Sequence, residues 1–314
     1  MTGPRAGDGA VPLIDRVARA RDCFARAGVA ADEARTDAEV LARHALGWDR
    51  AAWLARRRDP APASFEARYA PLVARRRKRE PVPYITRRRE FWGLDFAVGP
   101  AVLTPRPETE LIVEAAVELL GDRRSAPLRV ADVGTGSGCL AVTLAREFPR
   151  ASVTAIDISP AALAVARRNA AAHGVAERIA WVEGALADWL AGSSADGDGG
   201  GGGGLDLLAA NLPYVPTAEL DSLPPEIRLH EPRIALDGGP DGLDPLRDLL
   251  HAAPVALNPG ARLLVEIGTG QADGLRDLVA AAAGVELLDV RPDLQGIPRT
   301  AVLAADGSLE TAIA

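Results

Sequence analysis

The chain has 314 residues, 48% hydrophobic and 25% charged, which is typical of a globular protein and too apolar for a disordered one. Its 36 Lys and Arg against 43 Asp and Glu give a net charge of −7, which argues against a protein whose main affinity is for nucleic-acid phosphates. Two cysteines exclude a disulfide framework, and the absence of a signal-peptide pattern or a long apolar run predicts a soluble protein without a membrane span.

Residues 12 to about 82 are predicted to form a small, Arg-rich helical domain. Apolar residues recur at helical spacing in segment 37–46 and in segment 65–79. The second segment ends in the basic run Arg75–Arg79, which we interpret mainly as a solvated helix end that suits the helix macrodipole. A patch that contacts RNA is the alternative, but no base-stacking aromatic motif accompanies the run. We therefore expect no direct nucleic-acid partner.

After the helical domain, the sequence pattern changes from helical to extended. Segment 89–98 alternates partly and has Gly93 where a tight turn fits, which predicts a β-hairpin. A proline-rich loop, 103–110, and a helix from about Glu108 to Leu120 follow.

From Leu128 onward, short apolar strands alternate with helical segments, a pattern typical of a parallel α/β sheet. The predicted strands are Leu128–Val133, Ser152–Ile156, Ile179–Val182, Leu205–Ala210, Ala261–Ile267, Val285–Val290 and Thr300–Ala304. The helices predicted between them include Leu140–Glu147, Pro160–His173 and Gly242–Ala256. A low-complexity insert, Ser193–Gly204, is expected to be a surface loop.

A glycine-rich loop follows the first of these strands directly. Gly134-Thr-Gly-Ser-Gly138 lets the backbone turn sharply and approach a ligand at the start of the next helix. Asp157 ends the next strand, where a carboxylate can accept hydrogen bonds from ribose hydroxyls, and Ser159 is the better helix cap. The GxGxG spacing suits a dinucleotide pyrophosphate poorly and favours S-adenosylmethionine, which has no phosphate.

A second motif, Asn211-Leu-Pro-Tyr214, follows the strand that ends at Ala210. If this strand neighbours the one from Leu128, Asn211 projects into the same crevice as the cofactor. The Asn211 side-chain oxygen and the Leu212 carbonyl can accept the two N–H bonds of a substrate amide. Pro213 stiffens the turn, and Tyr214 provides an apolar wall beside developing positive charge.

Three segments together resemble the release-factor glutamine N5-methyltransferase (HemK-type) family: 104–110 (Thr-Pro-Arg-Pro-Glu-Thr-Glu), 132–138 and 211–214. The resemblance covers nearly the whole chain and implies a seven-stranded, Rossmann-like class I methyltransferase domain preceded by a helical domain. It also implies S-adenosylmethionine as the donor and the Gly-Gly-Gln glutamine of a peptide chain release factor as the acceptor. The family usually has Asn-Pro-Pro-Tyr where this chain has Leu212, and often has Asp-Trp where this chain has Glu183-Gly-Ala-Leu186.

On this basis we expect three parts: residues 1–85 for substrate recognition, 86–107 as a hairpin and Pro-rich linker, and 108–314 as the methyltransferase domain. Carried over by position, the resemblance assigns cofactor binding to Gly134, Thr135, Gly136, Ser137, Gly138, Asp157 and Asn211, substrate binding to Asn211, Leu212, Pro213 and Tyr214, and catalysis to Asn211, Pro213 and Tyr214. The four histidines show no metal-ligand spacing, so no metal site is expected.

We expect a cytoplasmic monomer that modifies a release factor. Three alternatives stay open: an N6-adenine methyltransferase acting on nucleic acid, a relative that methylates another protein or a small metabolite, and an interaction protein without activity.

Overall fold

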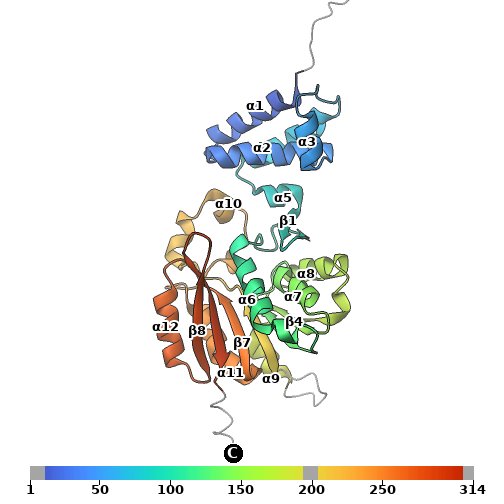
Figure 1. Cartoon of the computed structure of the whole chain (residues 1–314). Coiled ribbons are helices and arrows are strands. Elements are labelled where there is room, and N and C mark those ends of the chain that lie inside the picture. The colour runs from blue at the N-terminus through green and yellow to red at the C-terminus, as the bar shows by residue number, and fades with distance from the viewer. Residues whose placement is uncertain (1–10, 194–203, 307–314) are drawn as a thin grey trace, which may run out of the picture. The chain divides into compact units, whose positions relative to one another are not determined.

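The computed structural model describes residues 11–193 and 204–306, so most of the low-complexity insert lies outside the described residues (Figure 1). The chain divides into two compact units. One comprises Met1–Arg87 together with Pro224–His230, and the other comprises Arg88–Leu223 together with Glu231–Ala314. The hairpin that we expected in a linker falls in the second unit, and a short segment of the expected methyltransferase domain falls in the first.

The first unit is helical, as the apolar spacing predicts. Gly47 ends its second helix in the left-handed conformation, at φ 67°, and Asp49 caps the third by accepting a bond from the Ala52 N–H at 2.7 Å. A buried core that includes Phe24, Trp53 and Phe65 holds the helices together. The helices are α1 (Leu13–Arg26), α2 (Ala31–Leu46), α3 (Arg50–Arg56), α4 (Phe65–Arg77), α5 (Val82–Thr86) and α10 (Pro225–Arg228).

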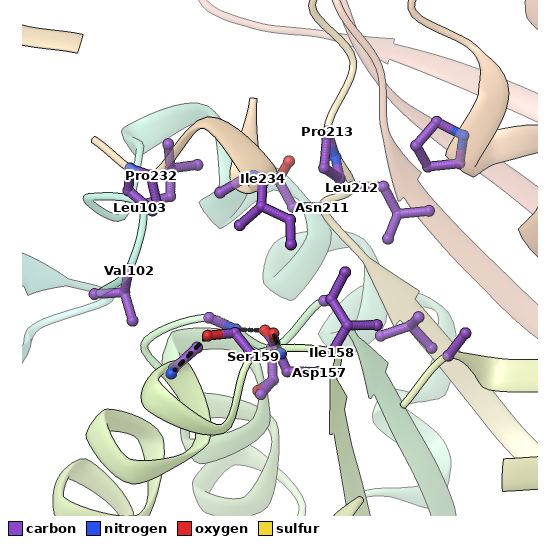
Figure 2. Close-up of a pocket in the computed structure, with 18 of the residues that line it drawn as sticks. Val102, Leu103, Asp157, Ile158, Ser159, Asn211, Leu212, Pro213, Pro232 and Ile234 are labelled. Carbon is purple, nitrogen blue, oxygen red and sulfur yellow. Dashed lines mark hydrogen bonds between the residues drawn. The ribbon is translucent and has the colours of Figure 1, made fainter. Parts of the chain in front are cut away.

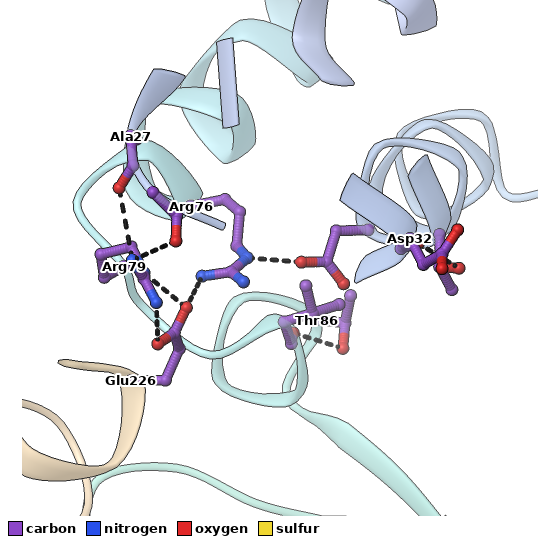
Figure 3. Close-up of polar contacts among 10 residues, drawn as sticks. Ala27, Asp32, Arg76, Arg79, Thr86 and Glu226 are labelled. Atoms are coloured by element: carbon purple, nitrogen blue, oxygen red, sulfur yellow. Dashed lines mark hydrogen bonds and ion pairs between the residues drawn. The ribbon is translucent and has the colours of Figure 1, made fainter. Parts of the chain in front are cut away.

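The basic run at the end of α4 is solvated only in part: Arg77 and Lys78 are exposed, but Arg76 is buried, so the interpretation was wrong for Arg76. Arg76 is only 3% exposed and pairs with Asp37 at 2.6 Å and with Glu226 at 2.7 Å. Arg79 also pairs with Glu226, at 2.6 Å (Figure 3). Arg75 pairs with Glu80. Carboxylates distant in the sequence neutralise Arg76 and Arg79, which a local pattern of charge does not reveal.

The second unit begins with the expected hairpin. Strands β1 (Arg88–Phe91) and β2 (Leu94–Ala97) pair antiparallel. Trp92 and Gly93 between them have φ of 53° and 70°, as a two-residue hairpin turn of the favoured twist requires. A 3₁₀ turn (Pro107–Thr109) and α6 (Glu110–Leu120) follow.

The predicted α/β sheet is confirmed, with seven strands in the order β5-β4-β3-β6-β7-β9-β8. All neighbours from β5 to β7 are parallel, whereas β9 is antiparallel to both of its neighbours. The pure parallel pattern fails there because residues 293–297 link β8 to β9, a connection too short for a crossover helix. The strands are β3 (Arg129–Val133), β4 (Ser152–Asp157), β5 (Ile179–Glu183), β6 (Leu205–Ala210), β7 (Leu257–Glu266), β8 (Val285–Pro292) and β9 (Pro298–Ala305).

Two apolar clusters, one on each face, bury the sheet. Residues of α6 and α7, including Ile112 and Leu144, pack into the first cluster. Residues of α11 and α12, including Leu249 and Leu275, pack into the second. The helices of this unit besides α6 are α7 (Cys139–Glu147), α8 (Pro160–Ala172), α9 (Leu186–Ser193), α11 (Asp244–Ala256) and α12 (Ala272–Ala281). Strand β3 lies inside the sheet, with β4 on one side and β6 on the other, so their carboxyl ends meet at one edge.

Candidate active site

A cavity of about 860 Å³ opens at the carboxyl ends of β3, β4 and β6 (Figure 2). The glycine loop, the end of β4 and the motif after β6 all contribute to its lining, as the strand order predicts. Its apolar wall includes Val102, Leu103, Ile158, Leu212 and Ile234.

The glycine loop is built from left-handed backbone that other residues rarely adopt. Gly134, Gly136 and Gly138 have φ of 73°, 54° and 79°. A Cβ on Gly134 would lie 3.2 Å from the Leu212 side chain, and a Cβ on Gly138 would lie 3.0 Å from that of Ala166. Gly134, Thr135, Gly136 and Ser137 line the cavity. Gly138 instead lets α7 pack closely against α8.

Asp157 lies at the end of β4 and faces the cavity. Its Oδ2 accepts the Gly136 N–H and its Oδ1 accepts the Ser159 N–H, both at 2.8 Å. Ser159 caps α8 by accepting the Ala162 N–H at 3.2 Å, as predicted. Each carboxylate oxygen accepts up to two bonds, so Asp157 can still accept one bond at each oxygen. Burial raises the pKa of Asp157, although the bonds from Gly136 and Ser159 lower it.

The motif after β6 presents Asn211, Leu212 and Pro213 to the cavity, whereas Tyr214 is not among the described residues of the lining. Nδ2 of Asn211 lies 2.9 Å from Oγ1 of Thr109 and 2.9 Å from Oε2 of Glu266. The amide nitrogen therefore points toward these two acceptors, and the amide oxygen remains to accept a bond from a ligand.

Tyr214 anchors the motif through hydrogen bonds to residues outside the cavity lining. Its hydroxyl donates to Oε1 of Glu266 at 3.3 Å, and its carbonyl accepts the Gln271 Nε2–H at 2.9 Å. Gly268 makes room for the ring, since a Cβ there would lie 2.9 Å from the Tyr214 side chain. The apolar wall that we expected from Tyr214 is thus formed by other residues of the lining.

Glu266 and Thr109 are the site residues that the sequence reasoning missed. Glu266 ends β7 and is only 4% exposed, and Thr109 donates to its Oε2 at 2.6 Å. The available signal was an acidic residue at the carboxyl end of a predicted strand, the same signal that identified Asp157.

Two buried carboxyl groups at this edge of the sheet titrate near neutrality. Burial raises the pKa of Glu266 to about 7, although the bonds from Thr109 and Tyr214 lower it. Burial likewise raises the pKa of Asp132 to about 7, against the bonds from Thr135 and the backbone of α7.

The charge of the cavity lining is distinctly negative. It contains four aspartates, Asp157, Asp237, Asp244 and Asp248, and two arginines, Arg106 and Arg233. Arg106 pairs with buried Glu231 at 2.5 Å, and Arg233 pairs with Asp237 at 3.2 Å. Both arginines are therefore neutralised by carboxylates, and Asp244 is itself paired with Arg247. Asp157 and Asp248 have no ion pair among the described residues, so the lining favours a cationic ligand over a phosphate.

Across the described ranges, no group of three or more His, Cys, Asp and Glu could hold a metal ion. The helices of the same ranges include none long and apolar enough to cross a membrane.

Each of the two units contains a segment that matches a known family. Residues 16–86 match the family described as PrmC N-terminal domain, and residues 130–197 match a family described as methyltransferase domain. The catalytic domain of hMettl16, solved with an RNA hairpin of the MAT2A 3′UTR, superposes with a TM-score of 0.53 over 72% of this chain and 80% of that one. At 15% identity this likeness shows the fold alone.

Curated relatives are much more similar in sequence. A protein from Geobacter sulfurreducens is 46% identical over 81% of this chain and 83% of its own length. One from Cereibacter sphaeroides is 44% identical over 88% of this chain and 92% of its own length. Both are named release factor glutamine methyltransferase. The chain therefore belongs to the release factor glutamine methyltransferase family.

Proposed function

We propose that the protein transfers a methyl group from S-adenosylmethionine to the side-chain amide nitrogen (N5) of a release-factor glutamine, that of the Gly-Gly-Gln motif. The observation that carries this proposal is the orientation of Asn211, whose amide nitrogen bonds Glu266 and Thr109 while the residue lines the cavity. An acceptor in this position suits a substrate that presents N–H bonds.

The residues of the cavity fit S-adenosylmethionine. Asp157 has a further bond to accept at each oxygen, which suits the two hydroxyls of a ribose. The apolar side chains of Val102, Leu103 and Ile158 suit a purine. Asp157 and Asp248 have no ion pair among the described residues, whereas both arginines of the lining are paired, which suits a cation without phosphates. When bound, S-adenosylmethionine supplies a methyl group on a positively charged sulfur.

The chain's own residues then have to hold a poor nucleophile in place. An amide nitrogen shares its lone pair with its carbonyl group, so catalysis depends largely on positioning and on fixed dipoles. We assign the two N–H bonds of the substrate amide to the Asn211 side-chain oxygen and the Leu212 carbonyl. A backbone carbonyl is present whatever the side chain, so Leu212 can supply this acceptor although the family usually has proline at this position. Pro213 fixes φ in the turn, and Tyr214 anchors the motif from behind.

The remaining parts of the proposal concern surroundings and partners. A release factor works in translation, so we place the protein in the cytoplasm, and we propose that it acts as a monomer. We also propose that it does not contact nucleic acid directly. The support is that the strongest basic run, Arg75–Arg79, has Arg75, Arg76 and Arg79 in ion pairs with Glu80, Asp37 and Glu226.

The test is a methyl-transfer assay with labelled S-adenosylmethionine and purified release factors, with the modified residue mapped by mass spectrometry. We expect label on the Gly-Gly-Gln glutamine and none on a release factor in which that glutamine is replaced by asparagine. Asn211→Ala should lower kcat by about 100-fold or more, a typical effect of removing one positioned hydrogen-bond partner. Asn258→Ala is the matched control, because Asn258 bonds Gly204 outside the cavity. Cofactor binding without label on any release factor would contradict the proposed acceptor.

A further inference from the structure

The carboxylate of Glu266 stands directly behind Asn211. Its Oε2 lies 2.9 Å from the Asn211 nitrogen and 2.6 Å from the Thr109 hydroxyl, which is itself 2.9 Å from the same nitrogen. The three atoms form a compact triangle, so one N–H of Asn211 is shared between the two oxygens in a three-centre bond. Glu266 is buried and is not among the described residues that line the cavity.

The ionised form of Glu266, which prevails above its pKa of about 7, fixes the direction of each bond in this triangle. An ionised carboxylate only accepts, so the Thr109 hydroxyl donates to Glu266. With its proton committed, the Thr109 oxygen presents only lone pairs to Asn211. Both neighbours of the Asn211 amide are therefore acceptors, and they require its nitrogen to face them.

A side-chain amide has nearly the same shape when its oxygen and nitrogen are exchanged, so packing alone selects weakly between the two orientations. Reversing Asn211 would place its oxygen 2.9 Å from the carboxylate oxygen of Glu266, where two acceptors repel each other. The reversed Asn211 would also point its own N–H donors at the N–H donors of the substrate amide. The reversed site would have no side-chain acceptor for its substrate.

We infer that Glu266 is a positioning residue that, together with Thr109, fixes the Asn211 amide with its oxygen toward the substrate. This inference rests on the proposed function, because it assigns a role in presenting the glutamine. Glu266 acts through Asn211 and does not itself contact the substrate.

The first test compares Glu266→Leu, which can neither donate nor accept, with Glu266→Gln, whose amide oxygen can still accept from Asn211. We expect Glu266→Leu to lower kcat for release-factor methylation about 100-fold, with KM changed less than about threefold. S-adenosylmethionine affinity, measured by calorimetry, should change less than about twofold, because Glu266 lies outside the lining. The kcat of Glu266→Gln should be at least about tenfold higher than that of Glu266→Leu. Glu147→Leu is the control, since Glu147 also accepts bonds, from Trp92 and Arg124, but lies outside the cavity lining.

The second test reads the orientation of Asn211 without any turnover. The chain has three asparagines, Asn169, Asn211 and Asn258, so ¹⁵N labelling of asparagine side chains gives three amide signals, and Asn211→Asp assigns the relevant one. We expect the Asn211 amide to exchange its protons at least about tenfold faster in Glu266→Leu than in the wild type. The signals of Asn169 and Asn258 should stay unchanged.

The two tests separate the inference from the proposed function. A wild type that labels no release factor contradicts the proposed function, and the exchange of the Asn211 amide still decides whether Glu266 holds it. A wild-type kcat in Glu266→Leu overturns the inference. So does a loss of activity that appears only in KM or in thermal stability while the Asn211 exchange stays slow.

Discussion

The amide nitrogen of Asn211 and Oε2 of Glu266 lie 2.9 Å apart, although 55 positions separate the two residues in the chain. Strand β6 leads into Asn211 and the adjacent strand β7 ends at Glu266, so the pairing of these strands brings the two side chains to the same edge of the sheet. Which end of the Asn211 amide faces the substrate thus depends on Glu266, a residue that does not line the cavity.

Thr109 should matter for rate through its hydroxyl and not through its shape. Thr109→Val keeps the branched side chain but removes the proton given to Glu266 and the oxygen offered to Asn211. We expect kcat to fall about tenfold, the loss of about 1.4 kcal/mol that one hydrogen bond supplies. Thr143→Val is the matched control, since Thr143 is buried and its hydroxyl has no partner among the described residues. Equal losses in the two variants would contradict the role of Thr109.

Asp157 should set the affinity for the cofactor. Asp157→Asn keeps the size of the side chain but replaces one acceptor with a donor, which then faces the N–H of either Gly136 or Ser159. Hydrogen bonds to charged groups contribute about 1.5–3 kcal/mol, so S-adenosylmethionine should bind roughly 10- to 100-fold more weakly by calorimetry. Asp206→Asn removes a carboxylate that likewise accepts a backbone N–H, that of Arg129, at the opposite end of the sheet. An unchanged affinity in Asp157→Asn would exclude Asp157 from the cofactor site.

Glu226 should stabilise the helical unit. It bonds Arg76 and Arg79 (Figure 3), and Glu226→Gln leaves the buried Arg76 guanidinium with only Asp37 as a charged partner. We expect the free energy of unfolding to fall by about 2–4 kcal/mol at pH 7, below the full cost of breaking a buried pair because Glu226 is partly exposed. Glu66→Gln, in an exposed pair with Arg16, should cost less than about 0.5 kcal/mol.

The pH dependence of this effect has a definite sign. Burial would raise the pKa of Glu226, but the bonds from Arg79 and Arg76 outweigh it and lower the pKa to about 2. A lowered folded-state pKa stabilises the protein above the ordinary value of 4.5, and this stabilisation disappears as the pH falls toward 2. Urea unfolding of the wild type and Glu226→Gln should therefore converge at acidic pH. A difference that stays constant from pH 7 to pH 3 would show that charge pairing is not its source.

Glu266 should give the opposite pH dependence. Its pKa is raised by burial from 4.5 to about 7, so between these values the folded chain binds the proton more strongly than the unfolded chain does. The stability of the wild type should therefore fall as the pH rises through this range, and Glu266→Gln should fall less. Asp132→Asn is the comparison, because burial raises the pKa of Asp132 to about 7 as well. Thermal unfolding at pH 5, 6 and 7 measures the slopes, and parallel slopes for wild type and Glu266→Gln would contradict the assignment.

The sequence by itself determined the elements that depend on local pattern. Alternating strands and helices predicted the sheet, because the periods of 2 and 3.6 residues are properties of short segments. Strand ends located the glycine loop, Asp157 and Asn211, because the carboxyl ends of parallel strands meet at one edge. Ser159 was identified as the cap of α8 because a cap bonds a backbone group only three positions away.

Only the tertiary structure decided which side chains face one another across long separations in the chain. Thr109 lies 102 positions from Asn211, and Glu226 lies 150 positions from Arg76, so no local window contains either pair. The basic run was therefore interpreted as solvated, although Arg76 and Arg79 pair with carboxylates far away in the chain. Tyr214 was expected in the cavity wall, but Gly268 opens space for its ring elsewhere. The physical reason is the same in each case: periodicity fixes which face of an element is apolar, whereas strand order and packing fix which polar groups meet.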